Sequence, residues 1–418
     1  MSEWRELELG RGLRVKHGWA FKGEHFRDSG EQIVLTPGNF HDGGGFKPKN
    51  GTEKFYDGAY PEQFLLKRGD VVTAMTEQAQ GLLGSTATIP SDETFLHNQR
   101  IGLVEIADPE VLDLRYVYHL MNAPKVRRQL QATATGSKVR HTAPERIQDV
   151  RVAVPDIPTQ QVIAEVLDTV DALIENNRRR VAVLEEMARA IYREWFVKFR
   201  YSGHEDVPLV ESALGPIPDG WQVSTLAAIA DFTMGQSPKS EFYNDEGIGK
   251  PFHQGVADFG RYFPTTRKWC SVEGRSAEDG DVLISVRAPV GRINVADTAI
   301  TIGRGLAAVR AKDGRQGLLL GHLREAFAVE DSMGNDGAIF KSLGKAEFAS
   351  IPVVIPPSAV AESGNMILNE NFGMIRALSH SMQRLSALRD LLLPKLVTGQ
   401  IDVSALDLDA LLAKRVGS

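Results

Sequence analysis

The chain has 418 residues, enough for two or three domains with separate hydrophobic cores. Its 42% hydrophobic and 24% charged residues are ordinary for a globular protein, and its single cysteine excludes an internal disulfide. The net charge of −6 argues against a protein that coats nucleic acid through bulk charge, although it permits local basic patches. Because the chain has neither a long apolar run nor a signal-like start, we expect a cytoplasmic protein without membrane contact.

The sequence contains an internal repeat whose offset shrinks along the chain. The offset is first 217 (221 − 4), then 211 (281 − 70) and finally 201 (353 − 152). The paired positions are Trp4 and Trp221, Gly18 and Gly235, Asp70 and Asp281, and Val152 and Val353. The decreasing offset predicts two related globular heads that differ by insertions.

Each head has the pattern of a mixed α/β domain. Glycine and aspartate before an apolar run are typical of a turn leading into a buried strand. The predicted strands cover residues 71–75, 102–106, 282–286 and 306–309. The predicted helices cover residues 112–131, interrupted or kinked at Pro124, and 318–330. Glycine and proline between residues 201 and 219 predict a linker into the second head.

A long helix follows each head. The first is predicted from Pro158 to about Phe199, roughly 60 Å at 1.5 Å per residue. Apolar residues at alternating three- and four-residue steps form the seam of a coiled coil, so the two helices are predicted to pair. The first seam is Leu167, Ile174, Asn177, Val181, Leu184, Ile191 and Trp195; the second is Leu368, Ile375, Leu378, Met382, Leu385, Leu392 and Leu396. Asn177 is either a register-fixing polar residue or a solvated defect. The second helix is weakened at its start by Gly364 and Gly373, and Pro394 ends or kinks it.

The motifs of several enzyme classes are missing from the sequence. There is no phosphate-binding loop, no polar-Pro-Pro-aromatic motif of an amino-methyltransferase, no dinucleotide fingerprint and no His/Cys cluster with metal spacing. We therefore predict no catalytic residue, no metal site and no cofactor bound by this chain.

Polar loop residues instead suit the reading of DNA. Arginine matches guanine, Asn or Gln matches adenine, and Lys or Ser matches phosphate, although exposed loops of many proteins share this composition. The candidates in the first head are Thr76, Gln78, Asn98, Gln99, Arg100, Ser137, Lys138 and Arg140. Those in the second head are Gln254, Arg261, Arg287, Arg292, Arg304 and Lys341.

The sequence resembles the specificity subunit of type I restriction-modification systems over nearly its whole length. The segments that carry the resemblance are 154–171, 184–185, 195–199, 268–270, 280–291, 303–308 and 392–396. The usual Pro-x-x-Glu-Gln at the helix start is here Pro158-Thr159-Gln160-Gln161, and Pro357-Ser358-Ala359-Val360 departs further.

The resemblance implies a non-catalytic subunit with two target-recognition domains, each reading half of a split, asymmetric site in double-stranded DNA. The two helices would pair antiparallel, set the unread gap and dock two methylation subunits, which methylate adenine N6 with S-adenosylmethionine. Restriction subunits would use ATP and Mg²⁺ to cleave unmodified DNA. The implied boundaries are heads at 1–157 and 220–357, spacer helices at 158–200 and 358–400, a linker at 201–219 and a tail at 401–418.

Two alternatives remain open from the residues alone. One is an enzyme that itself cleaves or methylates, which the missing motifs oppose. The other is a coiled-coil scaffold that binds proteins but not DNA, and the acidic net charge leaves room for it.

Overall fold

The computed structural model describes residues 4–49, 51–77, 81–137, 139–332 and 343–403. These residues form two compact units. Unit 1 holds the described residues of 1–175 and 383–418, and unit 2 holds those of 176–382. The division falls within the two long helices, so each unit contains one globular head and part of both helices. No helix in the described part of the chain is long and apolar enough to span a membrane.

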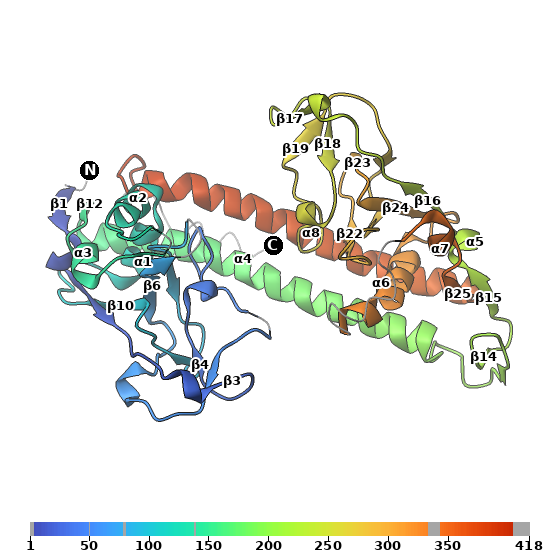
Figure 1. Cartoon of the computed structure of the whole chain (residues 1–418), viewed down its shortest axis with the longest axis horizontal. Coiled ribbons are helices and arrows are strands. Elements are labelled where there is room, and N and C mark those ends of the chain that lie inside the picture. Colours follow the sequence, from blue (N-terminus) through green and yellow to red (C-terminus); the bar gives the residue numbers. More distant parts are fainter. Residues whose placement is uncertain (1–3, 50, 78–80, 138, 333–342, 404–418) are drawn as a thin grey trace. The chain divides into compact units, whose positions relative to one another are not determined.

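The head of unit 1 is built on a four-stranded antiparallel sheet in the order β2-β10-β6-β8, with a second four-stranded sheet β3-β5-β4-β9. Figure 1 shows α1 and α2 beside the first sheet. The strands are β1 (Arg5–Glu8), β2 (Leu13–His17), β3 (Phe26–Arg27), β4 (Ile33–Val34), β5 (Phe55–Tyr56), β6 (Val71–Ala74), β7 (Thr76–Glu77), β8 (Thr86–Thr88), β9 (Phe95–Leu96), β10 (Ile101–Ile106), β11 (Arg140–His141) and β12 (Arg151–Val154). The helices are α1 (Leu114–Asn122), α2 (Pro124–Ala132), α3 (Pro144–Gln148) and the long α4 (Ile157–Tyr192).

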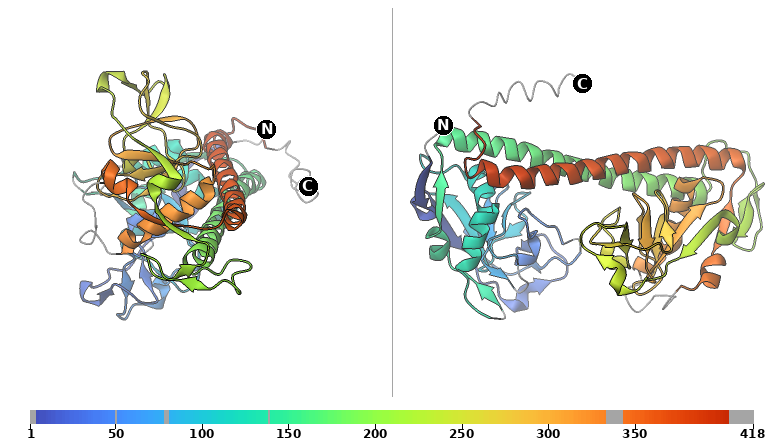
Figure 2. Two further views of the ribbon diagram at one scale, coloured as in Figure 1. Left: turned by 90° about the vertical axis from the view of Figure 1, so that its right-hand side faces the viewer. Right: turned by 90° about the horizontal axis from the view of Figure 1, so that it is seen from above.

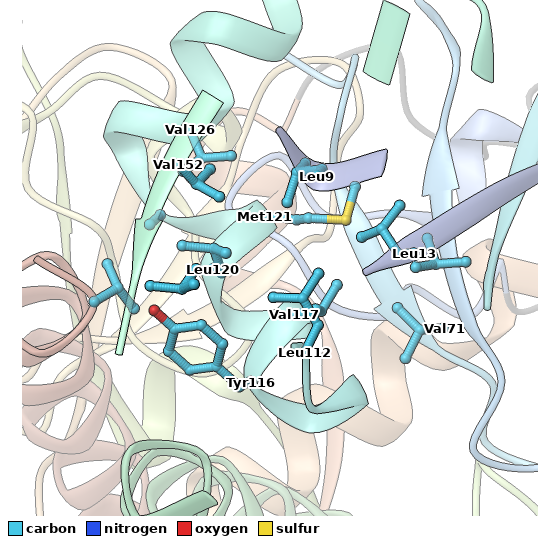
Figure 3. Packing of buried hydrophobic residues seen from close by; sticks show 14 of the residues in the cluster. Leu9, Leu13, Val71, Leu112, Tyr116, Val117, Leu120, Met121, Val126 and Val152 are labelled. Atoms are coloured by element: carbon cyan, nitrogen blue, oxygen red, sulfur yellow. The ribbon is translucent and has the colours of Figure 1, made fainter. Parts of the chain in front are cut away.

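The main core of unit 1 lies between this sheet, α1 and the long helices. Figure 3 shows Tyr116, Val117 and Leu120 of α1 in one apolar cluster with Leu9 and Leu13. The same apolar cluster takes in residues 163–167 of α4 and 392–397 at the end of α8 (Ser358–Leu396). Burial of one large aliphatic side chain contributes about 2 kcal/mol, so this shared core holds the head on the helices.

The head of unit 2 repeats the main sheet as β16-β24-β21-β22 and adds a five-stranded sheet, β17-β19-β18-β23-β20. Its strands are β13 (Leu209–Val210), β14 (Ile217–Pro218), β15 (Gln222–Thr225), β16 (Ala230–Met234), β17 (Tyr243–Asn244), β18 (Lys250–His253), β19 (Lys268–Cys270), β20 (Ser276–Ala277), β21 (Val282–Ser285), β22 (Ile293–Val295), β23 (Ile300–Ile302), β24 (Leu306–Ala311) and β25 (Pro352–Ile355). Its helices are α5 (Leu226–Ile229), α6 (Gln316–Ser332) and α7 (Lys345–Ala349).

The internal repeat is also seen in the register of the paired strands. In unit 1 the first strand of the head pairs with the last, Arg5 opposite Val154; in unit 2 Gln222 stands opposite Ile355. These partners are shifted by 217 (222 − 5) and 201 (355 − 154), the offsets found in the sequence. The prediction of two related mixed α/β heads with paired long helices is confirmed.

The long helices lie side by side and antiparallel within each unit (Figure 2). In unit 1, Arg389 of α8 forms an ion pair with Asp171 of α4 at 3.1 Å. In unit 2, Asn177 Nδ2 donates to Ser381 Oγ at 3.2 Å, while Tyr192, further along α4, packs with Leu368, earlier in α8.

The predicted helix over 112–131 is two helices rather than one kinked helix. Ala123 is extended, with ψ 137°, and Pro124 is the first residue of α2. The proline ring disfavours helical backbone in the residue before it and needs no hydrogen bond at a helix start, so the chain turns here.

Two further expectations are refined by the structure. Residues 201–219, predicted as a linker, contain the β13–β14 hairpin, and buried Tyr201 and Ile217 pack around Trp221. Helix α8 starts at Ser358, so the departure from the usual motif does not shorten it, and it runs through Pro394 to Leu396. Gly364 serves packing, because a Cβ there would lie 2.3 Å from Cζ of the buried Phe196.

Candidate nucleic-acid interface

Three loops meet at one end of the main sheet of unit 1. The Trp19 N–H donates to His97 O at 2.8 Å, and the Gln99 N–H donates to Trp19 O at 3.1 Å. The Met75 N–H donates to Arg100 O at 3.0 Å, which brings the residue after it, Thr76, to the same place. We name Trp19, Thr76 and Asn98–Arg100 tip 1.

The backbone of tip 1 is fixed from beneath. A Cβ on Gly18 would lie 2.3 Å from the carbonyl carbon of Asn98, so only glycine fits between the two loops. His97 is buried and its Nε2 lies 2.8 Å from Ile101 O. Burial lowers the pKa of His97 to about 4, so the imidazole is neutral near pH 7 and supports the loop. Gln99 and Arg100 are exposed above this support.

Arg140, a candidate from the sequence, is held by other groups. Its guanidinium forms an ion pair with Glu77 at 2.7 Å and donates to Gln131 O at 2.7 Å. The Glu77 carboxylate is buried and also accepts the N–H groups of Gly81 and Leu83. Arg140 therefore holds the Glu77 carboxylate in place, and little of its guanidinium remains for a ligand. Ser137 is exposed, and the candidates Gln78 and Lys138 lie outside the described residues.

Unit 2 repeats two of the three backbone hydrogen bonds of tip 1, while the Arg304 N–H, in the place of the Gln99 N–H, donates to Ser237 Oγ. The Gln236 N–H donates to Ile302 O at 3.0 Å, and the Val286 N–H donates to Gly305 O at 2.9 Å. A Cβ on Gly235 would lie 2.2 Å from Gly303 O, as confining as the surroundings of Gly18. We name Gln236, Gln254, Arg287 and Arg304 tip 2.

Ser237 ties tip 2 together. Its hydroxyl lies 3.0 Å from Gln254 Oε1 and accepts the Arg304 N–H at 3.1 Å. Arg287 and Arg304 are exposed, and neither guanidinium has an ion-pair partner among the described residues. Two unpaired guanidiniums beside an amide match the donor and acceptor pattern of base edges and phosphates.

Two other candidates of unit 2 lie elsewhere. Arg261 forms an ion pair with Glu185 of α4 at 2.9 Å. Arg292 and Arg261 both line a cavity of about 530 Å³ between α4, α6 and the loop before β22, with Arg324 stacked over Tyr262. Lys341 lies outside the described residues. The predicted set in unit 2 therefore divides into tip 2 and a pair beside the helix.

None of the predicted seam residues is exposed, and most of them pack in apolar clusters that contain residues of both long helices. Buried are Leu167, Ile174, Asn177, Val181, Leu368, Ile375 and Leu396. Half-buried are Leu184, Ile191, Trp195, Leu378, Met382, Leu385 and Leu392.

Sequence reasoning did not identify two sets of residues. Trp19 and Gln236 each follow a repeated glycine, and that glycine was the available signal. The second set comprises exposed apolar side chains of the two long helices, which the seam pattern does not include. Its members are Val183, Met187, Met366 and Met374 in unit 2 and Leu388 and Leu391 in unit 1.

Known proteins resemble this chain in sequence and fold. The family described as "Type I restriction modification DNA specificity domain" matches residues 1–186. The putative type I restriction enzyme MjaX specificity subunit of Methanocaldococcus jannaschii is 32% identical over 215 residues, 51% of this chain and 50% of that protein. The MjaIX specificity subunit of the same organism is 22% identical over 302 residues, 70% of each chain. The match thus spans about half the length of the first relative.

The fold has a solved counterpart. The crystal structure of a type I restriction-modification system S subunit from M. genitalium matches with a TM-score of 0.62 at 15% identity, covering 94% of this chain and 96% of that one. At this identity the likeness concerns the fold alone. The chain therefore shares its fold with this S subunit, and its sequence is similar to type I restriction-modification specificity subunits over part of its length.

Proposed function

We propose that this chain is the non-catalytic DNA-recognition subunit of a type I restriction-modification complex. Each head reads one half of a bipartite, asymmetric site in double-stranded DNA. The observation that carries the proposal is the pair of tips: one hydrogen-bonded framework occurs twice but presents unlike side chains. A framework that stays constant while its side chains differ is what two readers of different sequences require.

The helices, in this proposal, set the gap between half-sites and dock two methylation subunits. Helix α4 is continuous over 36 residues, roughly 54 Å at 1.5 Å per residue. Val183 and Met187 are exposed one turn apart on α4, and such apolar side chains are suited to contact with a partner helix. The methylation subunits would use S-adenosylmethionine, and restriction subunits would join with ATP and Mg²⁺.

A methylome tests the recognition role. The chain is co-expressed with the methylation subunit of its genomic neighbourhood in a methylation-free host, and N6-methyladenine is mapped by long-read sequencing. A split motif that requires both genes supports the proposal. A soluble complex without methylation overturns it and favours a protein scaffold.

Copurification tests the docking surface. A Val183→Asp/Met187→Asp variant places two charges on the apolar face and should lose the methylation subunit while keeping its fold. Asn176→Asp/Ala190→Asp adds the same charges to the same side of α4, seven residues before Val183 and seven after it, and shows how far the contact extends along the helix. Retention of the methylation subunit by Val183→Asp/Met187→Asp would contradict docking on this face.

A further inference from the structure

The residue after the repeated glycine occupies one equivalent position in both heads. Trp19 and Gln236 differ by 217 (236 − 19), and both N–H groups donate to the strand-end carbonyls His97 O and Ile302 O. Because the N–H of this residue is held by an equivalent carbonyl in both heads, the two heads present unlike side chains from one equivalent backbone position.

A second position changes together with the first. His97 N–H donates to Phe64 O at 2.8 Å, and Ile302 N–H donates to Arg275 O at 2.8 Å. Phe64 and Arg275 are therefore equivalent, at an offset of 211 (275 − 64). The first head carries an aromatic pair where the second carries an amide and a guanidinium.

The side chain of Trp19 is both exposed and supported. It is 41% exposed, and its ring lies 5.4 Å from that of Phe64 at an interplanar angle of 38°. A large indole left in water loses the free energy that its burial would contribute, which marks it as a contact for a ligand. Since Phe64 occupies one side of the ring, Trp19 is suited to contact from one side and not to insertion between two base pairs.

The side chain of Gln236 is exposed and polar. Among the described residues its amide has no hydrogen-bond partner, in contrast to Gln254, which is tied to Ser237. A free amide on a fixed backbone can donate to adenine N7 and accept from adenine N6 at the same time.

Resting on the proposed function, we propose that the residue after the glycine determines specificity in each head. Trp19 packs against a thymine C5-methyl group in the first half-site, with Phe64 behind it. Gln236 forms a bidentate hydrogen-bond pair with an adenine in the second half-site. The same backbone position thus contacts an apolar group of the DNA in one head and a polar base edge in the other.

The test uses the purified complex with its methylation subunit and synthetic duplexes carrying the mapped motif. Replacing each thymine of the first half-site by uracil removes only the methyl group. At one position this should lower the methylation rate of the wild-type complex by roughly three- to ten-fold, the range expected for the loss of one buried methyl group. Trp19→Ala should cause a similar loss on the thymine duplex and make the complex indifferent to that uracil. Trp19→Phe should retain part of the discrimination.

The second head serves as the internal control. Trp19→Ala should leave the second half-site unchanged, and Gln236→Ala should relax one adenine of the second half-site while leaving the first unchanged. If Trp19→Ala remains as sensitive to uracil as the wild type, or if both half-sites change, the inference fails while the methylome still supports DNA recognition. Absence of any motif would instead overturn the proposed function itself.

Discussion

Asn177 of α4 donates a hydrogen bond to Ser381 of α8 at 3.2 Å, between the apolar seam residues Ile174 and Val181. Asn177 is 8% exposed, so its amide is paired and shielded and is not a solvated defect. A polar pair at a seam specifies register, because any slip along the helices would bury the amide without a partner.

Replacing this pair by apolar residues should stabilise the helix contact. We expect Asn177→Leu/Ser381→Ala to raise the free energy of unfolding by about 1 kcal/mol, since a buried amide becomes a buried aliphatic group. Thermal denaturation measures the change. Asn177→Ala alone should lower stability, and a double variant less stable than the wild type would contradict this account.

Two glycines of α8 should respond oppositely to the same substitution. Gly373 has open space where a Cβ would stand, so Gly373→Ala should stabilise the helix by about 0.5–1 kcal/mol. Gly364→Ala should destabilise it, because the new methyl group meets the buried Phe196 ring. Chemical denaturation of the two variants provides a matched comparison, and equal effects would show that Phe196 moves aside.

Alanine variants of Arg140 and Arg100 should differ in stability, because Arg140 is paired with a buried carboxylate and Arg100 is exposed. Arg140→Ala leaves the buried Glu77 carboxylate without its cation and should cost about 2 kcal/mol or more. Arg100→Ala should change stability by no more than about 0.5 kcal/mol, because its guanidinium is exposed and has no ion pair among the described residues. Denaturation and DNA affinity are measured on both; a stable Arg140→Ala variant would refute the structural role.

Acid should destabilise unit 1 through His97. The unfolded imidazole has a pKa near 6.5, whereas burial lowers the native pKa to about 4. Between pH 6.5 and pH 4 the His97 imidazole is therefore protonated in the unfolded chain but neutral in the native state. The stability contributed by the neutral native imidazole should be intact above pH 6.5 and fall by about 3 kcal/mol on approaching pH 4.

Comparison of variants isolates this effect. His97→Gln should flatten the dependence of unfolding free energy on pH between 6.5 and 4, even if it lowers stability at neutral pH. His141→Gln, at an exposed position, should leave the profile unchanged. Profiles that remain parallel for the wild type and His97→Gln would rule out His97 as the source.

Local chemistry explains why some elements could be predicted from the sequence. The turns before β6 and β21 were recognised from glycine and aspartate, and the structure shows the reason. Asp70 accepts the Lys67 N–H at 2.8 Å, and Asp281 accepts the Glu278 N–H at 2.8 Å. Both residues of each of these hydrogen bonds lie within four consecutive positions, so the turn can be recognised from the local sequence. The same is true of the three- and four-residue steps of the long helices.

Other features depend on partners far away in the chain. The Arg140–Glu77 ion pair joins residues 63 positions apart, so the loop residues gave no sign that this arginine was already engaged. Tyr201 is buried only because Trp221 and Phe196 lie beside it, which makes a segment with linker composition part of a core. The two-residue strands β3, β4 and β5 are too short to show an alternating pattern.

The pairing of the first and last strands of each head has an evolutionary consequence. Because β1 pairs with β12 and β15 pairs with β25, the first and last strands of each head are adjacent. Insertions and deletions between these strands leave the helix register untouched, and the offset accordingly falls from 217 to 201 within the heads alone. The gene can therefore exchange or remodel one head as a cassette while the other head and the coiled coil keep their sequence.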